Sequence, residues 1–371
     1  MKALQLAPTR VDALKSYRLS FTGQAAHGPA PDRQPTKSPM QTAAPPSTEP
    51  SAPKDVPSYQ GSRRPDVASI PFLILKTMRP KQWTKNVLVF AGLLFALKFT
   101  DVSAILKSLA AFGLFCLFSS CVYLINDILD RDKDSLNPRT AKRPIASGAL
   151  PWQIAAGAVA VILPVTFVLS YLLNPWFALV GAVYMAKDFG YSFGLKHVVI
   201  LDVFLLAAGF TLRAMAGALA IDVPISEWLY VVTTLGALFL ALNKRKHEIL
   251  LLGEGASGHR KVLDEYSPAL IEEMLAVITA STVMSYSLYT FTAANLPRPL
   301  QENKLMMLTI PFVLYGIFRY LYLVYQKNEG SSPEEVLLRD RPLLVCCVLW
   351  AITSATLLYL FSPISGIHWG S

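Results

Sequence analysis

Long apolar stretches recur along the chain from residue 86 onward, and each approaches the roughly 20 residues that an α-helix needs to cross a bilayer. Apolar residues make up 53% of the 371 residues and charged residues only 16%, which is less charge than a soluble domain of this size carries. We therefore expect an all-α membrane protein that contacts the lipid bilayer through many helices. The nine predicted spans are residues 86–100, 103–126, 151–173, 175–193, 197–220, 226–243, 269–293, 305–326 and 342–362.

Two segments precede these spans. Residues 1–68 are rich in Pro, Ala, Ser, Thr and Gln, lack a periodic apolar face and contain no apolar core long enough for a signal peptide, so we predict a disordered tail. Residues 69–86 mix Arg79, Lys81 and Lys85 with Trp83, which is typical of a membrane boundary. The remainder, residues 69–371, is predicted to be one polytopic transmembrane domain.

The basic residues between the spans predict the orientation. Most of the lysines and arginines there lie in loops that follow even-numbered spans, and the loops after odd-numbered spans hold few. Because cytoplasmic loops carry the excess of Lys and Arg, we expect a cytoplasmic N-terminus and an outside C-terminus. The polar stretches of interest then all fall on the cytoplasmic side, where we expect the functional site.

The most informative polar stretch follows the second span. Asn126, Asp130 and Asp134 recur every four residues, so a continued helix places them on one face, with Asp127 beside them. Oxygen ligands in such a stripe suit Mg²⁺, which prefers one or two carboxylates together with phosphate oxygens. Four acidic or amide groups at the end of an apolar span are costly without such a role. A solvated helix end of mixed charge is the alternative interpretation.

Basic residues that could hold a phosphate follow this stripe, and further polar residues lie at later span ends. Lys142 and Arg143 come directly after it, and Tyr191 and Lys196 close the next cytoplasmic loop. Tyr191 and Lys196 could equally be interfacial anchors that extend toward water.

The fifth predicted span contains two charged residues, Asp202 and Arg213, which are functional candidates because charge inside a membrane is expensive. They are three helical turns apart, so they are not expected to pair with each other. Arg213 could instead satisfy backbone carbonyls. Lys187 and Asp188 interrupt the fourth span, and no feature of the sequence accounts for them.

Charged residues also end the sixth span. Lys244 and Glu248 share one helix face, with Arg245 between them. An anion clamp and a purely topological role both fit this stretch.

Cysteines and histidines give no sign of a metal or redox site. The four cysteines lie in apolar spans without CxxC spacing, and His197 and His247 lack metal-ligand spacing. No nucleic-acid-binding module is visible.

Together these residues resemble the UbiA-type prenyltransferase superfamily, whose Asn-Asp-x-x-Asp-x-x-x-Asp motif corresponds here to Asn126–Asp134. More closely, the chain is similar to the decaprenyl-phosphate phosphoribosyltransferase branch over residues 70–362. The matching stretches are Arg79–Asn86, Lys142–Ile145, Tyr191–Lys196, Lys244–Glu248, Arg319–Tyr320, Ser332–Glu335 and Arg339–Arg341.

The resemblance implies a nine-helix bundle with a cytoplasmic-side cavity in the cell (inner) membrane. It implies 5-phosphoribosyl diphosphate as donor, polyprenyl (decaprenyl) phosphate as acceptor and Mg²⁺ as cofactor, with Asp127, Asp130 and Asp134 catalytic and Asn126 completing the metal ligands. The substrate-binding residues that it implies are Lys81, Lys85, Asn86, Asn126, Lys142, Arg143, Tyr191, Lys196, Asp202, Lys244, Arg245 and Glu248.

One departure from the wider superfamily separates two activities. Aromatic prenyltransferases carry a second Asp-rich motif after the sixth span, and here that place holds Asn243–Glu248 with three basic residues. This argues against aromatic prenyl transfer, which is the main alternative. A transporter is a further alternative, although no internal repeat favours it, and the signature of CDP-alcohol phosphotransferases is absent.

Overall fold

The computed structural model describes residues 69–361, except 139, 253–260, 294–295, 328–335 and 338. All of these residues lie within one unit, residues 61–371. Every regular element among them is a helix, which confirms the predicted all-α class. The predicted disordered tail, residues 1–68, lies outside the described residues.

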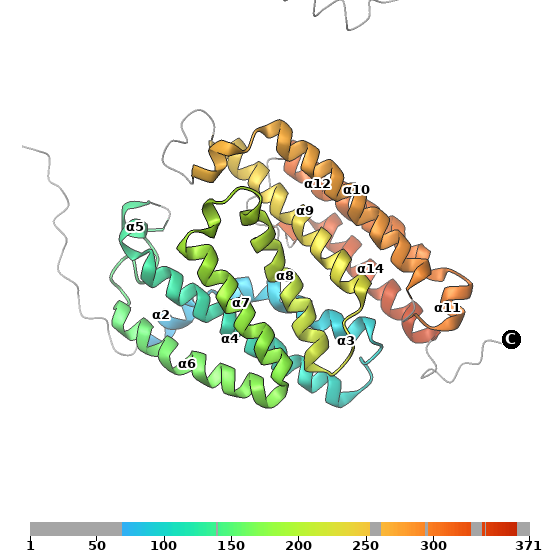
Figure 1. Ribbon diagram of the computed structural model, residues 1–371, viewed down its shortest axis with the longest axis horizontal. Helices are drawn as coiled ribbons and strands as arrows, with labels where there is room; N and C mark the ends of the chain where they lie inside the picture. Colours follow the sequence, from blue (N-terminus) through green and yellow to red (C-terminus); the bar gives the residue numbers. More distant parts are fainter. Residues whose placement is uncertain are drawn as a thin grey trace, which may run out of the picture. The chain divides into compact units, whose positions relative to one another are not determined.

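The helices follow one another along the chain with short connections (Figure 1). The first half comprises α2 Ile70–Thr77, the 3₁₀ helix η2 Pro80–Phe90, α3 Ala91–Phe95, α4 Val102–Leu129, α5 Arg131–Leu136, α6 Trp152–Leu173, α7 Pro175–Phe193 and the 3₁₀ helix η3 Leu195–His197. The second half comprises α8 Leu201–Ala220, α9 Glu227–Leu252, the 3₁₀ helix η5 Lys261–Glu265, α10 Pro268–Thr292, α11 Arg298–Glu302, the 3₁₀ helix η6 Leu305–Thr309, α12 Ile310–Gln326 and α14 Arg341–Leu360.

Six helices in the described part of the chain are long and apolar enough to cross a membrane. They are α4, α6, α8, α10, the η6–α12 segment Leu305–Gln326, and α14. The predicted fourth and sixth spans are helices, α7 and α9, but Lys187 and Asp188 in α7 and the charged end of α9 lower their hydropathy.

The predicted first span, residues 86–100, differs most from the structure. The segment forms η2 and the five-residue α3, and regular helix ends at Phe95. Polar residues such as Lys81, Lys85 and Asn86 lie within η2, so it lacks the continuous apolar run that favours a long membrane helix.

Helix α8 lies between the two halves of the bundle and contacts α9 and α7 as well as η2, α3 and α4 (Figure 1). Its side chains enter both large hydrophobic clusters, one with α9, α10 and α12 and one with α4 and α7. Gly217 permits a close approach of η2, because a Cβ there would come within 1.8 Å of the Val89 carbonyl oxygen. The absence of a side chain at Gly217 therefore allows η2 to pack directly against α8.

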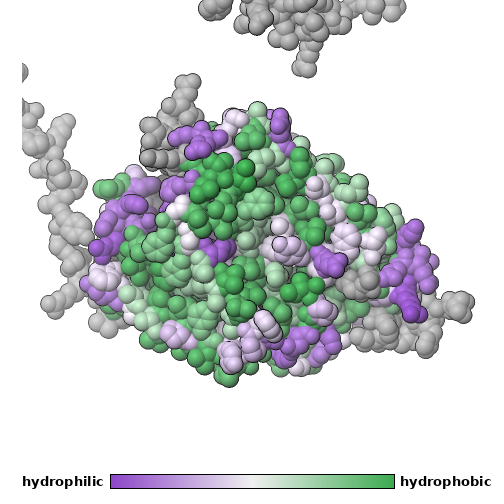
Figure 2. Space-filling model, viewed as in Figure 1, coloured by the Kyte–Doolittle hydropathy of each residue, from purple (hydrophilic) through white to green (hydrophobic). Residues whose placement is uncertain are grey.

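The outer surface matches a bilayer environment. Hydrophobic residues cover much of the face shown in Figure 2, and most of the hydrophilic surface lies toward its edges. Helix α6 buries only Ala155, Thr166 and Ser170, and several of its apolar side chains, such as Val161, Val168 and Leu172, are exposed. Apolar side chains exposed over several helices are expected where lipid replaces water as the solvent.

Candidate active site

The acidic motif lies where α4 ends. Helix α4 stops at Leu129, α5 begins at Arg131, and Asp130 occupies the junction, so the predicted continuous helix is broken there. Backbone hydrogen bonds from Asp130 N to Asn126 O and from Asp134 N to Asp130 O still carry the helical turn across the break, at 2.9 and 2.8 Å. The motif therefore stays compact, but its side chains divide between different partners.

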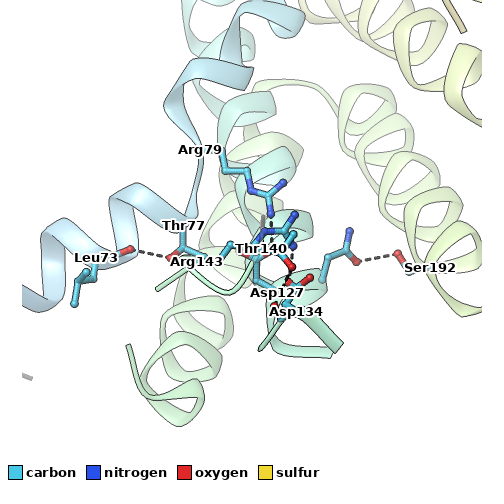
Figure 3. A network of polar contacts seen from close by, with 9 residues as sticks. Leu73, Thr77, Arg79, Asp127, Asp134, Thr140, Arg143 and Ser192 are labelled. Carbon is cyan, nitrogen blue, oxygen red and sulfur yellow. Dashed lines mark hydrogen bonds and ion pairs between the residues drawn. The ribbon is translucent and has the colours of Figure 1, made fainter. Parts of the chain in front are cut away.

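Two of its carboxylates share an arginine (Figure 3). Arg143 Nη1 lies 2.5 Å from Asp134 Oδ2 and 3.3 Å from Asp127 Oδ1. Asp127 also accepts a hydrogen bond of 2.5 Å from Arg79 Nη2. Because Asp127 is buried and Asp134 nearly so, the two guanidinium groups offset the repulsion between the carboxylates.

The elements that deliver these arginines are distant in sequence. Arg79 follows α2 with a left-handed φ of 55°, which turns the chain into η2, and its guanidinium lies 4.8 Å from the centre of the Tyr123 ring. Arg143 belongs to the connection between α5 and α6, where Thr140 donates a hydrogen bond to the Asp134 carbonyl. Arg79 was not among the predicted site residues, although it begins the basic stretch before the first predicted span.

A cavity of about 210 Å³ opens beside this group. It is lined by Lys76, Thr77, Arg79, Asp127, Lys142, Arg143 and Pro144. Its lining carries four basic side chains and one carboxylate, so the cavity favours an anionic ligand, and arginine suits phosphate oxygens through bidentate contacts.

The other two motif residues lie apart from the shared arginine. The Asn126 side-chain oxygen accepts a hydrogen bond of 2.8 Å from the Ser192 hydroxyl, which ties α4 to the end of α7. Asp130 is partly exposed at the helix junction. Among the residues that the structure describes, no three His, Cys, Asp or Glu side chains form a group ready to hold a metal.

The donor set nevertheless fits Mg²⁺. Asp127 and Asp134 supply two carboxylates beside a cavity that attracts anions, and Mg²⁺ is usually bound by one or two carboxylates together with substrate phosphates. A phosphate-bearing ligand would complete a coordination sphere that the protein alone does not provide.

A second polar network joins the ends of α7, α8 and α9. Arg245 Nε donates to Asp202 Oδ2 at 2.6 Å, and another nitrogen of Arg245 donates to the Tyr191 hydroxyl at 3.0 Å. Arg245 also forms an ion pair with Glu248. Arg245 and Asp202 are fully buried. Four predicted site residues, Tyr191, Asp202, Arg245 and Glu248, therefore lie together, and Arg245 is a hydrogen-bond or ion-pair partner of the other three.

Tyr266 completes this network and was not among the predicted site residues. Its hydroxyl donates to Asp202 Oδ1 at 2.7 Å and accepts from the Ile200 backbone N–H at 2.6 Å. Burial, together with the hydrogen bond to Asp202, raises the pKa of Tyr266, which keeps the hydroxyl protonated as a donor.

Asn86 lies in a third group. It is fully buried, and its side-chain oxygen accepts a hydrogen bond of 2.7 Å from Arg213 Nε. Arg213 also donates to the Gly209 carbonyl and to the Tyr184 hydroxyl. The alternative prediction that Arg213 hydrogen-bonds to a backbone carbonyl is therefore confirmed. The expectation that Asp202 and Arg213 have separate partners is also confirmed.

The remaining predicted basic residues occupy scattered positions. Lys142 lines the cavity, Lys81 is exposed on η2, and Lys85, Lys196 and Lys244 are half-buried. Their roles in binding a substrate stay predictions.

Similarity to known proteins agrees with this arrangement. A model of the UbiA prenyltransferase family matches residues 87–339, which is most of the described chain. The chain belongs to the UbiA prenyltransferase family.

Relatives and solved structures extend this assignment. The chain is 35% identical over 297 residues to decaprenyl-phosphate phosphoribosyltransferase of Mycolicibacterium smegmatis, covering 77% of this chain and 92% of that protein. It is 35% identical over 291 residues to the protein of the same name from Corynebacterium glutamicum, covering 77% and 87%. A UbiA homologue from Archaeoglobus fulgidus, solved with DMAPP and Mg²⁺, matches 77% of this chain and 98% of its own with a TM-score of 0.57 and 16% identity. At that identity the UbiA homologue supports the fold alone.

Proposed function

We propose that this UbiA-family protein transfers 5-phosphoribose from 5-phosphoribosyl diphosphate to a polyprenyl phosphate and releases diphosphate. The observation that carries the proposal is the anion-attracting cavity at Asp127, where Arg79 and Arg143 meet the carboxylates of the UbiA motif. The names of the relatives that share about a third of its residues support the choice of substrates.

The reaction exchanges one carbon–oxygen bond for another. An oxygen of the lipid phosphate attacks ribose C1 while the bond from C1 to the diphosphate breaks, and the diphosphate leaves with the electron pair. Positive charge develops on the sugar and negative charge on the leaving group. Groups preorganised around the departing diphosphate therefore contribute most to catalysis.

The residues at the cavity match this requirement. Arg79, Arg143 and Lys142 would hold phosphate oxygens and orient the donor. Asp127 and Asp134 are the carboxylates that would hold Mg²⁺, which neutralises diphosphate charge when bound.

The acceptor needs no general base. A phosphate monoester has a second pKa of about 6, so the lipid phosphate is already largely ionised at neutral pH. This agrees with a motif whose carboxylates pair with arginine and whose asparagine accepts from Ser192. In this proposal the side chains bind and position, and proton transfer is not rate-determining.

The end of α9 supports phosphoribosyl transfer over aromatic prenyl transfer. Arg245 there neutralises Asp202 and interacts with Glu248, so these carboxylates already have a cation partner from the protein. Lys244 and Lys246 flank Arg245, so this stretch carries more positive than negative charge, which disfavours a second metal ion there. The two-metal arrangement that an acidic motif would give a prenyl diphosphate is therefore disfavoured.

A paired assay tests the proposal. Purified protein in lipid vesicles would receive radiolabelled phosphoribosyl diphosphate with decaprenyl phosphate in one reaction, and a prenyl diphosphate with 4-hydroxybenzoate in another. Label in the lipid fraction of the first reaction is the expected result. A prenylated aromatic product in the second reaction, with no labelled lipid in the first, would replace the proposal with the alternative.

A further inference from the structure

Lys187 and Asp188 form a charged pair inside α7 that the site described above does not use. Lys187 Nζ lies 2.5 Å from Asp188 Oδ1, and the side chains are 11% and 18% exposed. A pair so placed within an otherwise apolar helix is costly, which makes a function for it the default hypothesis.

The pair belongs to a larger group around Arg213 of α8. The Lys187 ammonium lies 5.1 Å from the centre of the Tyr184 ring, and the Tyr184 hydroxyl accepts a hydrogen bond of 2.9 Å from Arg213. The hydrogen-bond partners that Arg213 has among the described residues, Asn86, Gly209 and Tyr184, are all uncharged. This group therefore holds two cations and one carboxylate, and one positive charge is left without an anion.

The carboxylates paired with Arg245 do not neutralise this charge. Asp202 precedes Gly209 by seven residues on α8, which places them about 10 Å apart along the helix axis. That separation is too long for an ion pair. The excess positive charge beside Lys187 is therefore available to a ligand.

Gly209 lies where the two cations converge. A Cβ at this glycine would lie 3.2 Å from Arg213 Nη1 and 3.3 Å from Lys187 Nζ. A side chain at residue 209 would crowd both nitrogens, so glycine at this position lets the two cations lie close together. Lysine has three N–H donors, and the bond to Asp188 uses one of them.

The same part of α7 leads to the acidic motif. The Ser192 hydroxyl bonds both to the Asp188 carbonyl, at 2.9 Å, and to Asn126, at 2.8 Å. Lys187 precedes Ser192 by about one and a half turns on α7, so the charged pair and the motif are joined by one short helical segment.

We propose that Lys187 and Arg213 form a second anion subsite, above Gly209, for the phosphate monoester of one of the two substrates. The inference rests on the proposed function, in which both substrates carry such a group. The group is either the 5-phosphate of the donor or the phosphate of the lipid acceptor.

Steady-state kinetics with each substrate varied separately tests this subsite. The main variant is Lys187→Met combined with Asp188→Asn, which removes both charges and leaves no unpaired carboxylate. We expect the KM for one phosphate-bearing substrate to rise about tenfold to a hundredfold, the range for one charge-assisted hydrogen bond. A rise for the donor assigns the subsite to the 5-phosphate, and a rise for decaprenyl phosphate assigns it to the acceptor.

Two further variants distinguish ligand binding from a structural ion pair. Lys187→Arg should retain a KM close to that of the unmodified protein, because it keeps the charge. Asp188→Asn alone should leave KM unchanged or lower it, since it makes the subsite more positive. A structural pair would instead show lowered thermal stability in Lys187→Met and in Asp188→Asn alike, with both KM values unchanged, and that result would overturn the inference.

The same experiment separates this inference from the proposed function. Absence of transfer by the unmodified protein contradicts the proposed function. Transfer by the unmodified protein, with unaltered KM values in the double variant, contradicts only the subsite.

Discussion

Asp134 and Asp132 are two residues apart in α5 and have opposite surroundings. The Asp134 side chain is 12% exposed and pairs with Arg143, whereas that of Asp132 is 89% exposed and pairs with Arg131 on the surface. The contrast lets one short helix provide both the test of the site and its control.

Asp134→Ala should lower phosphoribosyl transfer by at least the ~10²–10³-fold typical of losing one preorganised electrostatic contact. Asp132→Ala should leave transfer unchanged, because it removes only a surface ion pair. Initial rates for purified variants with matched thermal stability provide the measurement. Equal rates for both variants would remove Asp134 from the site.

Arg245 is the largest fully buried side chain among the described residues, and it holds Asp202 and Glu248. Arg245→Leu would leave Asp202 buried without its cation, at a cost of about 3–5 kcal/mol. We expect a clear drop in the unfolding temperature in detergent. Arg131→Leu, which breaks an exposed pair, should cost no more than about 1 kcal/mol. A stable Arg245→Leu protein with altered substrate affinity would instead indicate direct binding by Arg245.

Several of these residues were predictable one by one but not as partners. The stripe of Asn126, Asp130 and Asp134, with Asp127 beside it, follows from local spacing along one helix. The pairing of Arg79 with Asp127 joins residues 48 apart in sequence, and that of Arg245 with Asp202 joins residues 43 apart. Helical periodicity reports only neighbours within a few turns, so neither pairing could be derived from it.

At the scale of elements, the close contact between η2 and Gly217 of α8 fixes the position of η2 in the bundle. Gly217→Ala would place a methyl group on the Val89 carbonyl, and η2 could relieve the clash only by moving. Forced overpacking of this kind typically costs about 1–3 kcal/mol. We expect a lower unfolding temperature and reduced activity.

Gly157→Ala in α6 is the matched control, because a Cβ there meets no atom within 4 Å. Replacing this glycine should leave stability unchanged or raise it by up to about 1 kcal/mol through helix propensity. Equal destabilisation by both replacements would show that the close contact between Gly217 and Val89 does not contribute to the stability of the protein.

The helices themselves were predicted well where they are apolar. The predicted spans 103–126 and 151–173 correspond to α4 Val102–Leu129 and α6 Trp152–Leu173. The first span was predicted as a membrane helix but forms η2 and α3, and the contact of η2 with the distant Gly217 could not be read from local hydropathy.

For the whole molecule, the distribution of basic residues leads us to propose that the α4–α5 site faces the cytoplasm. A single cysteine placed at exposed Asp132, in a protein otherwise free of cysteine, should be protected from a membrane-impermeant thiol reagent in intact cells. One placed at Asp222, between α8 and α9, should react, because its side chain is 59% exposed and the proposed orientation assigns this connection to the outside. The reverse pattern would invert the proposed orientation.

The most direct test of the central claim is the mass of the lipid product. Decaprenyl phosphate would be incubated with the purified protein, Mg²⁺ and phosphoribosyl diphosphate, extracted, and examined by mass spectrometry. The account predicts a lipid that keeps its phosphate and gains one phosphoribosyl group, with no gain when Mg²⁺ is chelated. An unmodified lipid in the presence of both substrates and Mg²⁺, from protein shown to be folded, would contradict it.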